Sequence, residues 1–314
     1  MKIGEMIAPR AAFGDALVEL GKTNSEVVVF DSDVGESTQT ARFGKAYPDR
    51  FYQMGIAEAN MVCAAAGMST LGYTPWVSTF AVFLAKRAVD QIRVSIAYPK
   101  LNVKLNGAYG GIPTGKAGAT HQAIQDIAVM RAMPNMTVWV ASDAVETRQM
   151  VIESAKHQGP LYMRTVRCPV PVIFGNDYKF ESGRSYCVTE GNDIAIIATG
   201  MMTPKALEAA KELDKEGIKA RVIHMPTVKP IDEEAIVKAS KDIGKIITIE
   251  NHSMIGGLGG AVSEVLTDKA PCYLSRLGFP DIFGESGDNE KIFSKFGVNT
   301  ENIIAKAKEL ARGK

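Results

Sequence analysis

The stretch Met54-Gly-Ile-Ala-Glu58-Ala-Asn-Met61 decides the fold, because an extended run ends at its glycine and a helical run starts at its glutamate. Further along, Trp76-Val-Ser-Thr-Phe80-Ala-Val-Phe83 repeats this change from strand to helix. Such repeats predict parallel strands covered by helices. No neighbour in the sequence supplies a cation to Glu58, so we expect a buried, neutral acid with a raised pKa. Facing Phe80 and Phe83, that acid would suit a flat heterocycle that forms hydrogen bonds.

The composition is ordinary for a globular enzyme. The 314 residues are 46% hydrophobic, and 36 basic residues nearly balance 35 acidic ones. This balance predicts no nucleic-acid partner and no membrane-surface partner. No apolar run approaches the roughly 18 residues of a membrane-spanning helix, and we expect no signal peptide. The four cysteines lie far apart, which predicts reduced thiols in a cytoplasmic protein, with neither disulfides nor a metal site.

Short apolar runs alternate with amphipathic ones, which predicts an α/β protein of two domains, each a mostly parallel sheet flanked by helices. Two alternating prolines after Cys168 interrupt the rhythm. We therefore predict a first domain at 1–175, a linker at 176–190 and a second domain at 191–314. The expected strands are Val27–Phe30, Phe51–Met54, Thr74–Val77, Asn102–Asn106, Met136–Ala141, Leu161–Arg164, Asp193–Thr199, Ala220–His224, Lys245–Ile249 and Cys272–Leu277, and the last expected helix is Thr300–Arg312.

Polar clusters follow three of these strands. Asp33 and Ser37 come after the first, Glu58 after the second, and His121 after a long glycine-rich loop. Because open α/β sheets bind ligands at the carboxyl ends of their strands, we expect these clusters to share one crevice. His121 is the best candidate to handle a substrate hydroxyl, since neutral imidazole both donates and accepts near pH 7.

Arginines and glycines offer further candidates. Arg10, Arg164 and Arg167 are possible anion clamps, because a guanidinium is always charged and donates in a fork. Gly256–Gly260 could be a phosphate-binding turn after Glu250, which would make a nucleotide site. Its glycine spacing does not fit the dinucleotide fingerprint, so we favour tight packing of a helix on a strand.

Together these motifs resemble the transketolase family, and the chain is similar from end to end to the C-terminal subunit of a split transketolase. The resemblance implies a pyrimidine-binding domain for thiamine diphosphate followed by a transketolase C-terminal domain. The motifs that carry it are Met54–Glu58, Ser78–Phe83, Thr120–Gln122, Pro134–Met136, Ala141–Asp143, Gly200–Ala206 and Glu250–Gly260.

The resemblance implies roles for individual residues. Glu58 matches the glutamate that hydrogen-bonds the pyrimidine ring, and Phe80 and Phe83 match the aromatics that pack on it. Ile56 and Asp33 match positions near the cofactor. His121 matches a histidine that contacts the donor sugar, and the residues that match the grip on the substrate phosphate are Arg10, Ser37 and Arg167.

Three positions depart from the family pattern. Ala117, preceded by Lys116, stands where an acid usually reads a hydroxyl of the donor sugar. Tyr109 stands near a usual histidine, and Lys86 stands near a usual tyrosine. The missing acid favours a modified or rarer ketose over the usual pentose and hexose phosphates.

The family's Gly-Asp-Gly and asparagine ligands for diphosphate and magnesium are missing here. Magnesium usually needs carboxylates together with phosphates. The resemblance therefore implies an N-terminal transketolase subunit that binds Mg²⁺ and shares thiamine diphosphate with this chain. The expected assembly is a heterotetramer with a homodimeric core, which moves a two-carbon ketol unit between sugar phosphates.

Three alternatives stay open. A deoxyxylulose phosphate synthase-like enzyme or a 2-oxo acid dehydrogenase beta subunit would share the architecture and the glutamate. The synthase pattern is usually one long chain, and such beta subunits lack the Thr120–Gln122 run. The chain could also be a non-catalytic regulatory subunit, although the intact Glu58, Phe80, Phe83 and His121 argue against loss of a site.

Overall fold

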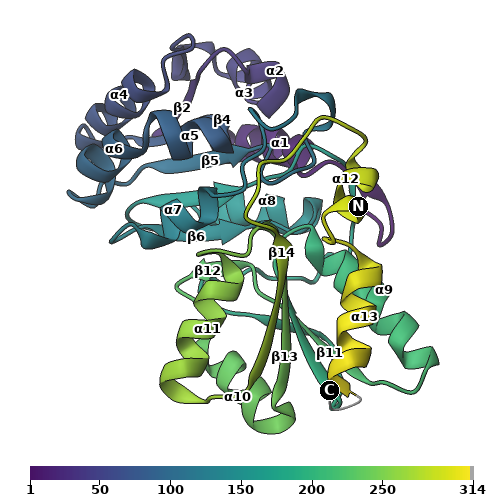
Figure 1. The fold of residues 1–314 in the computed structure, drawn as a ribbon. Helices are drawn as coiled ribbons and strands as arrows, with labels where there is room; N and C mark the ends of the chain where they lie inside the picture. Colours follow the sequence, from purple (N-terminus) through teal and green to yellow (C-terminus); the bar gives the residue numbers. More distant parts are fainter. Residues whose placement is uncertain (312–314) are drawn as a thin grey trace.

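A computed structural model describes residues 1–311, which form two large sheets, each covered by helices (Figure 1), and one small two-stranded sheet. The first sheet has seven strands in the order β12-β6-β7-β5-β4-β2-β3. All neighbours pair in parallel except β12, which pairs antiparallel with β6. The strands are β2 (Val27–Asp31), β3 (Phe51–Gln53), β4 (Thr74–Phe80), β5 (Lys104–Ala108), β6 (Thr137–Val140), β7 (Leu161–Arg164) and β12 (Thr227–Lys229).

Helices cover both faces of this sheet. Val27 and Val29 face α1 (Pro9–Thr23) and α8 (Ala144–Glu153), whereas Val28 and Phe30 face the opposite helical layer. This alternation follows from the two-residue period of a strand. The opposite layer contains α4 (Glu58–Thr70), α5 (Ala81–Arg87), α6 (Val89–Gln91), the π-helix η2 (Ile92–Ala97) and α7 (Asp126–Ala132). The remaining short helices are α2 (Gly35–Thr38), α3 (Ala41–Ala46), η1 (Pro48–Arg50) and η3 (Gly115–Ala117).

The second sheet has the order β14-β13-β10-β11-β9, and only β9 pairs antiparallel. Its strands are β9 (Tyr186–Thr189), β10 (Ile194–Ala198), β11 (Ala220–His224), β13 (Lys245–Ser253) and β14 (Tyr273–Phe279). Helices α9 (Met202–Lys215), α12 (Asn289–Lys295) and α13 (Thr300–Ala311) cover one face, and α10 (Glu233–Ile243) and α11 (Leu258–Lys269) cover the other. The predicted last helical residue, Arg312, and residues 313–314 lie outside the described residues.

The two sheets are joined through β12 and through buried polar side chains. Strand β12 follows β11 of the second sheet but pairs with β6 of the first, and it lies at their junction in Figure 1. Nearby, Glu146 on α8 accepts a hydrogen bond from the Tyr178 hydroxyl at 2.5 Å and lies 2.8 Å from His224 Nε2 on β11. Burial alone would raise the pKa of Glu146, but these two partners lower it. The short strands β1 (Met6–Ile7) and β8 (Val170–Pro171) pair separately.

The predicted α/β class with parallel sheets flanked by helices is confirmed. The predicted domain limits at 175 and 190 stay a prediction, and β9 forms within the segment assigned to a linker. No helix among residues 1–311 is long and apolar enough to cross a bilayer.

Candidate active site

The candidate site lies at the carboxyl ends of the parallel strands of the first sheet. Asp33 follows β2, Glu58 begins α4 just after β3, and Phe80 ends β4. Tyr109 follows β5, and Arg167 follows β7. Parallel strands place these ends on one edge, so polar and aromatic groups distant in sequence lie together.

Aromatic side chains form the wall of the site. Phe80 ends β4 and Phe83 lies in the first turn of α5, and their ring centroids are 5.7 Å apart. His121 lies edge-on to both rings, at 5.8 Å from Phe80 and 5.5 Å from Phe83. Thr120 Oγ1 lies 2.9 Å from His121 Nδ1 and orients the imidazole. The structure therefore brings together the aromatic pair and the histidine that the sequence predicted.

Glu58 is buried at the start of α4, with 3% of its surface exposed. The expectation that this chain supplies no cation to it is wrong, because Arg87 Nη1 donates to Glu58 Oε1 at 2.9 Å. Helix α5 packs against α4, which brings the last residue of α5 over the first residue of α4. The buried carboxyl group therefore has a positively charged partner within this chain.

A second cluster gathers positive charge around Tyr109. Arg10 Nη1 donates to the Ser37 carbonyl at 2.8 Å and to the Tyr109 hydroxyl at 3.2 Å. The guanidinium carbons of Arg10 and Arg167 lie 5.7 and 5.3 Å from the Tyr109 ring centroid. Tyr109 also stacks on Phe80, with centroids 4.2 Å apart. The tyrosine thus links the aromatic wall to two arginines, a bridging role that sequence reasoning missed.

Backbone strain occurs at two residues of the site. Asp33 and Tyr109 have φ angles of 66° and 60°, in the left-handed region that non-glycine residues rarely adopt. Such strain persists only where the surroundings impose it. Around Asp33, the buried Asp31 accepts hydrogen bonds from the Thr40 hydroxyl at 2.8 Å and the Gln53 amide at 3.1 Å. Asp33 lines a cavity of about 250 Å³ together with Ser37, and Ile56 lies 74% exposed in the segment before Glu58.

Arg164 is not available as an anion clamp, so that expectation is wrong. Its side chain is 2% exposed, and it donates to both carboxylate oxygens of Asp126 at 2.7 and 3.1 Å. It also donates to the carbonyls of Ala123 and Asn251, each at 2.9 Å. Arg164 therefore ties β7 to α7 and to the second sheet.

The glycine run after Glu250 packs a helix on a strand, as we favoured. Glu250 is fully buried and accepts hydrogen bonds from the backbone N–H groups of Leu258 at 2.7 Å and Gly259 at 2.8 Å. A Cβ at Gly257 would lie 1.9 Å from a Glu250 oxygen. The first amides of α11 therefore already have an internal anion. Burial raises the pKa of Glu250.

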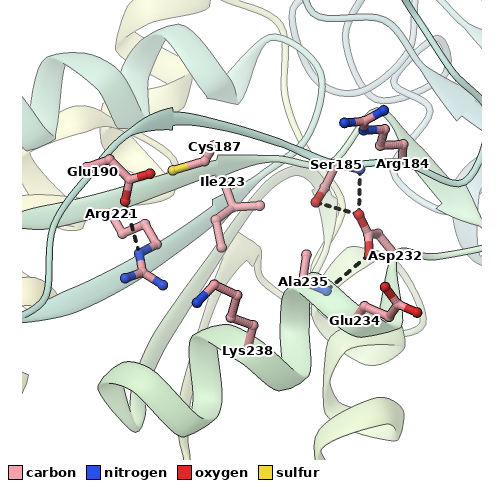
Figure 2. Close-up of a pocket in the computed structure, with 10 residues that line it drawn as sticks. All are labelled: Arg184, Ser185, Cys187, Glu190, Arg221, Ile223, Asp232, Glu234, Ala235 and Lys238. Atoms are coloured by element: carbon pink, nitrogen blue, oxygen red, sulfur yellow. Dashed lines mark hydrogen bonds and ion pairs between the residues drawn. The ribbon is translucent and has the colours of Figure 1, made fainter.

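A larger cavity of about 490 Å³ lies away from this site, between β9, β11 and α10 (Figure 2). Most of its charged groups already have partners within the chain. Asp232 accepts hydrogen bonds from Ser185 N and Oγ, both at 2.8 Å, and Arg221 lies 3.7 Å from Glu190. Outside the group drawn in the figure, Arg184 pairs with Glu181 and Lys238 pairs with Asp242.

Residues 1–311 contain no cluster of three or more histidine, cysteine, aspartate or glutamate side chains arranged to hold a metal ion. The described part of the chain thus offers aromatic, carboxylate and guanidinium groups rather than a metal centre.

Comparison with known proteins identifies the family. Residues 5–171 match the pyrimidine-binding domain of transketolase, and residues 183–303 match the transketolase C-terminal domain. A solved structure described as a split gene transketolase, inactive beta4 tetramer, is 48% identical, with a TM-score of 0.91 over 96% of this chain and 98% of its own.

Curated proteins that are similar to this chain along nearly all of its length also belong to the transketolase family. A Methanocaldococcus jannaschii protein provisionally named as a transketolase C-terminal section is 43% identical over 96% of this chain and 95% of its own length. The 6-deoxy-6-sulfo-D-fructose transketolase subunit of a Clostridium species is 37% identical over 97% of this chain and 95% of its own length. Rat transketolase is 36% identical, and the matched region is 50% of its length. The chain therefore belongs to the transketolase family.

Proposed function

We propose that this chain is the C-terminal subunit of a two-subunit transketolase that depends on thiamine diphosphate. The observation that carries the proposal is the buried carboxylate of Glu58, which Arg87 links to Phe83 in the aromatic wall of Phe80, Phe83 and His121. This donor set fits an aminopyrimidine, because the rings offer stacking surfaces and the carboxyl group can bond a ring nitrogen.

Each group of residues has a proposed task. Glu58 would hold a proton against the pyrimidine ring, while Phe80 and Phe83 would fix the plane of that ring. Ile56 and Asp33 would lie near the cofactor, and His121 would orient a hydroxyl of the donor sugar. When bound, thiamine diphosphate would supply the nucleophilic carbon that accepts a two-carbon ketol unit.

The positive cluster defines the proposed substrate class. Arg10 and Arg167 both lie close to the Tyr109 ring, and Arg10 also donates to the Ser37 carbonyl. Paired guanidinium groups suit a phosphate or sulfonate at the far end of a ketose. Ala117 leaves no carboxylate to select the usual donor, and Lys116 is exposed beside it. We therefore propose an anionic, modified ketose as donor, and the sulfosugar named for the Clostridium relative is of this chemical class.

A second subunit would complete the site. The region of rat transketolase that matches this chain is half of that enzyme, whereas the chain matches 95% of the Clostridium protein, which is named as a transketolase subunit. We propose that an N-terminal transketolase subunit binds Mg²⁺ and the diphosphate, in a heterotetramer built on a dimer of this chain. The split-gene tetramer is described as inactive, which supports a need for such a partner.

Reconstitution tests the proposal. The chain should be co-expressed with the neighbouring transketolase gene product, and ketol transfer should be measured with phosphorylated and sulfonated ketoses. Activity should require both chains and should fall at least 100-fold in Glu58→Gln. Carbon dioxide release from pyruvate would instead favour the synthase-like or dehydrogenase-like alternatives. Full activity of the Glu58→Gln complex would support a non-catalytic regulatory role.

A further inference from the structure

Arg87 contacts two of the residues that the proposed function assigns to the pyrimidine ring. Its Nη1 donates to Glu58 Oε1 at 2.9 Å, and its guanidinium carbon lies 4.1 Å from the centroid of the Phe83 ring. The distance to Phe83 is that of a close cation–π contact. One guanidinium therefore covers an aromatic ring while one of its edges bonds the buried carboxylate.

The guanidinium resembles the expected ligand in its chemistry. It is flat, it presents N–H donors in its own plane, and it stacks on aromatic faces. A pyrimidine ring that packs on Phe83 and bonds Glu58 would need the same aromatic surface and the same carboxyl group. Arg87 and such a ring therefore compete for one site.

We propose that Arg87 occupies the pyrimidine site while no cofactor is bound and withdraws when thiamine diphosphate binds. The inference rests on the proposed function and adds a displacement step to it. When the guanidinium leaves, the pyrimidine ring would take its place against Phe83 and Glu58.

The contact is suited to displacement. The Arg87 side chain is half exposed, and among residues 1–311 its side chain makes this one hydrogen bond and this one ring contact. Arg164, by comparison, is buried and donates to two carboxylate oxygens and two backbone carbonyls. Arg87 can therefore swing into solvent without breaking other structure.

Other charged groups near Glu58 do not replace Arg87 in this role. On the neighbouring helical segments, Asp90 pairs with Arg93 at 3.3 Å. His121 lies beside Phe83 and bonds Thr120. Within the described residues, Arg87 is the one charged group at ion-pair distance from Glu58.

Calorimetry on the assembled two-subunit complex tests the displacement. Thiamine diphosphate with Mg²⁺ is titrated into the wild-type complex and into each variant, which gives the dissociation constants. Arg87→Met should bind about tenfold more tightly than the wild type, because no cation–π contact or ion pair has to be broken. Arg87→Lys should lie between the two.

A matched control separates displacement from a general effect of removing an arginine. Arg148 is 44% exposed and pairs with Glu19 on the helices that cover the opposite face of the sheet, so Arg148→Met should titrate like the wild type. Weaker or equal cofactor binding by Arg87→Met would overturn the inference while leaving the proposed function intact. Failure of the wild-type complex to bind the cofactor would instead overturn the proposed function, and this inference with it.

Discussion

Replacing Arg164 with methionine should destabilise the chain strongly, because the change leaves Asp126 buried without a counter-charge. The two side chains are 2% and 0% exposed and share two hydrogen bonds. Removing one partner of a buried pair costs about 3 to 5 kcal/mol. The carbonyls of Ala123 and Asn251 also lose a donor. We therefore expect a loss of about 4 to 6 kcal/mol in the free energy of unfolding.

A double-mutant cycle gives the sharper test of this pair. Urea unfolding is measured at one protein concentration for Arg164→Met, Asp126→Asn and the double variant. The double variant should lose much less than the sum of the single losses, because it leaves no unpaired charge. Arg148→Met, which breaks an exposed pair, should cost less than about 1 kcal/mol. A loss below 1 kcal/mol in Arg164→Met, or strictly additive losses, would refute the reasoning.

Three further changes have defined outcomes. Burial lowers the pKa of Lys104 to about 7, against 10.5 in an unfolded chain, so the unfolded state binds more protons between these values. Stability in urea should therefore rise with pH across this window, and an equal slope in Lys104→Met would contradict this. Gly111→Ala should cost more than about 2 kcal/mol in thermal melts, because φ is +80° and a Cβ would lie 2.0 Å from Asn251 Nδ2; a melt like the wild type would count against this packing. Tyr109→Phe removes the hydroxyl that Arg10 bonds, so in the assembled enzyme KM for a phosphorylated ketose should rise about three- to tenfold with kcat unchanged. The same ketose without phosphate should be unaffected, and equal effects on both sugars would indicate general packing.

Much of the fold could be predicted because buried parallel strands are continuous apolar runs. Strands β7 and β11 have the predicted bounds, and the other predicted strands differ by a few residues at their ends. Strand β12 was not predicted, because Thr227-Val-Lys is short and becomes a strand only by pairing with β6 of the other sheet. Residues 81–97 form α5, α6 and a π-helix in place of one continuous helix, a change of winding that no apolar period reveals.

The candidate site, like the fold, could be predicted where the local sequence determines it but not where contacts between distant segments do. The convergence of Phe80, Phe83 and His121 follows from strand ends, which the sequence marks with glycines and polar residues. The side of the sheet that an arginine faces depends on packing, so Arg164 and Arg167 look alike in sequence although Arg164 pairs with Asp126 inside the chain. The roles of the individual residues stay predictions, and the geometry shows which side chains are close enough to act together.

The most direct test of the shared site is binding of thiamine diphosphate with Mg²⁺, measured by calorimetry for this chain alone and for the chain assembled with its N-terminal subunit. In the proposed function, Glu58, Phe80 and Phe83 bind only the pyrimidine part of the cofactor, and residues 1–311 hold no metal-binding cluster. The account predicts tight binding only in the assembled pair. Tight binding by this chain alone would contradict it, because the chain would then contain a diphosphate site of its own.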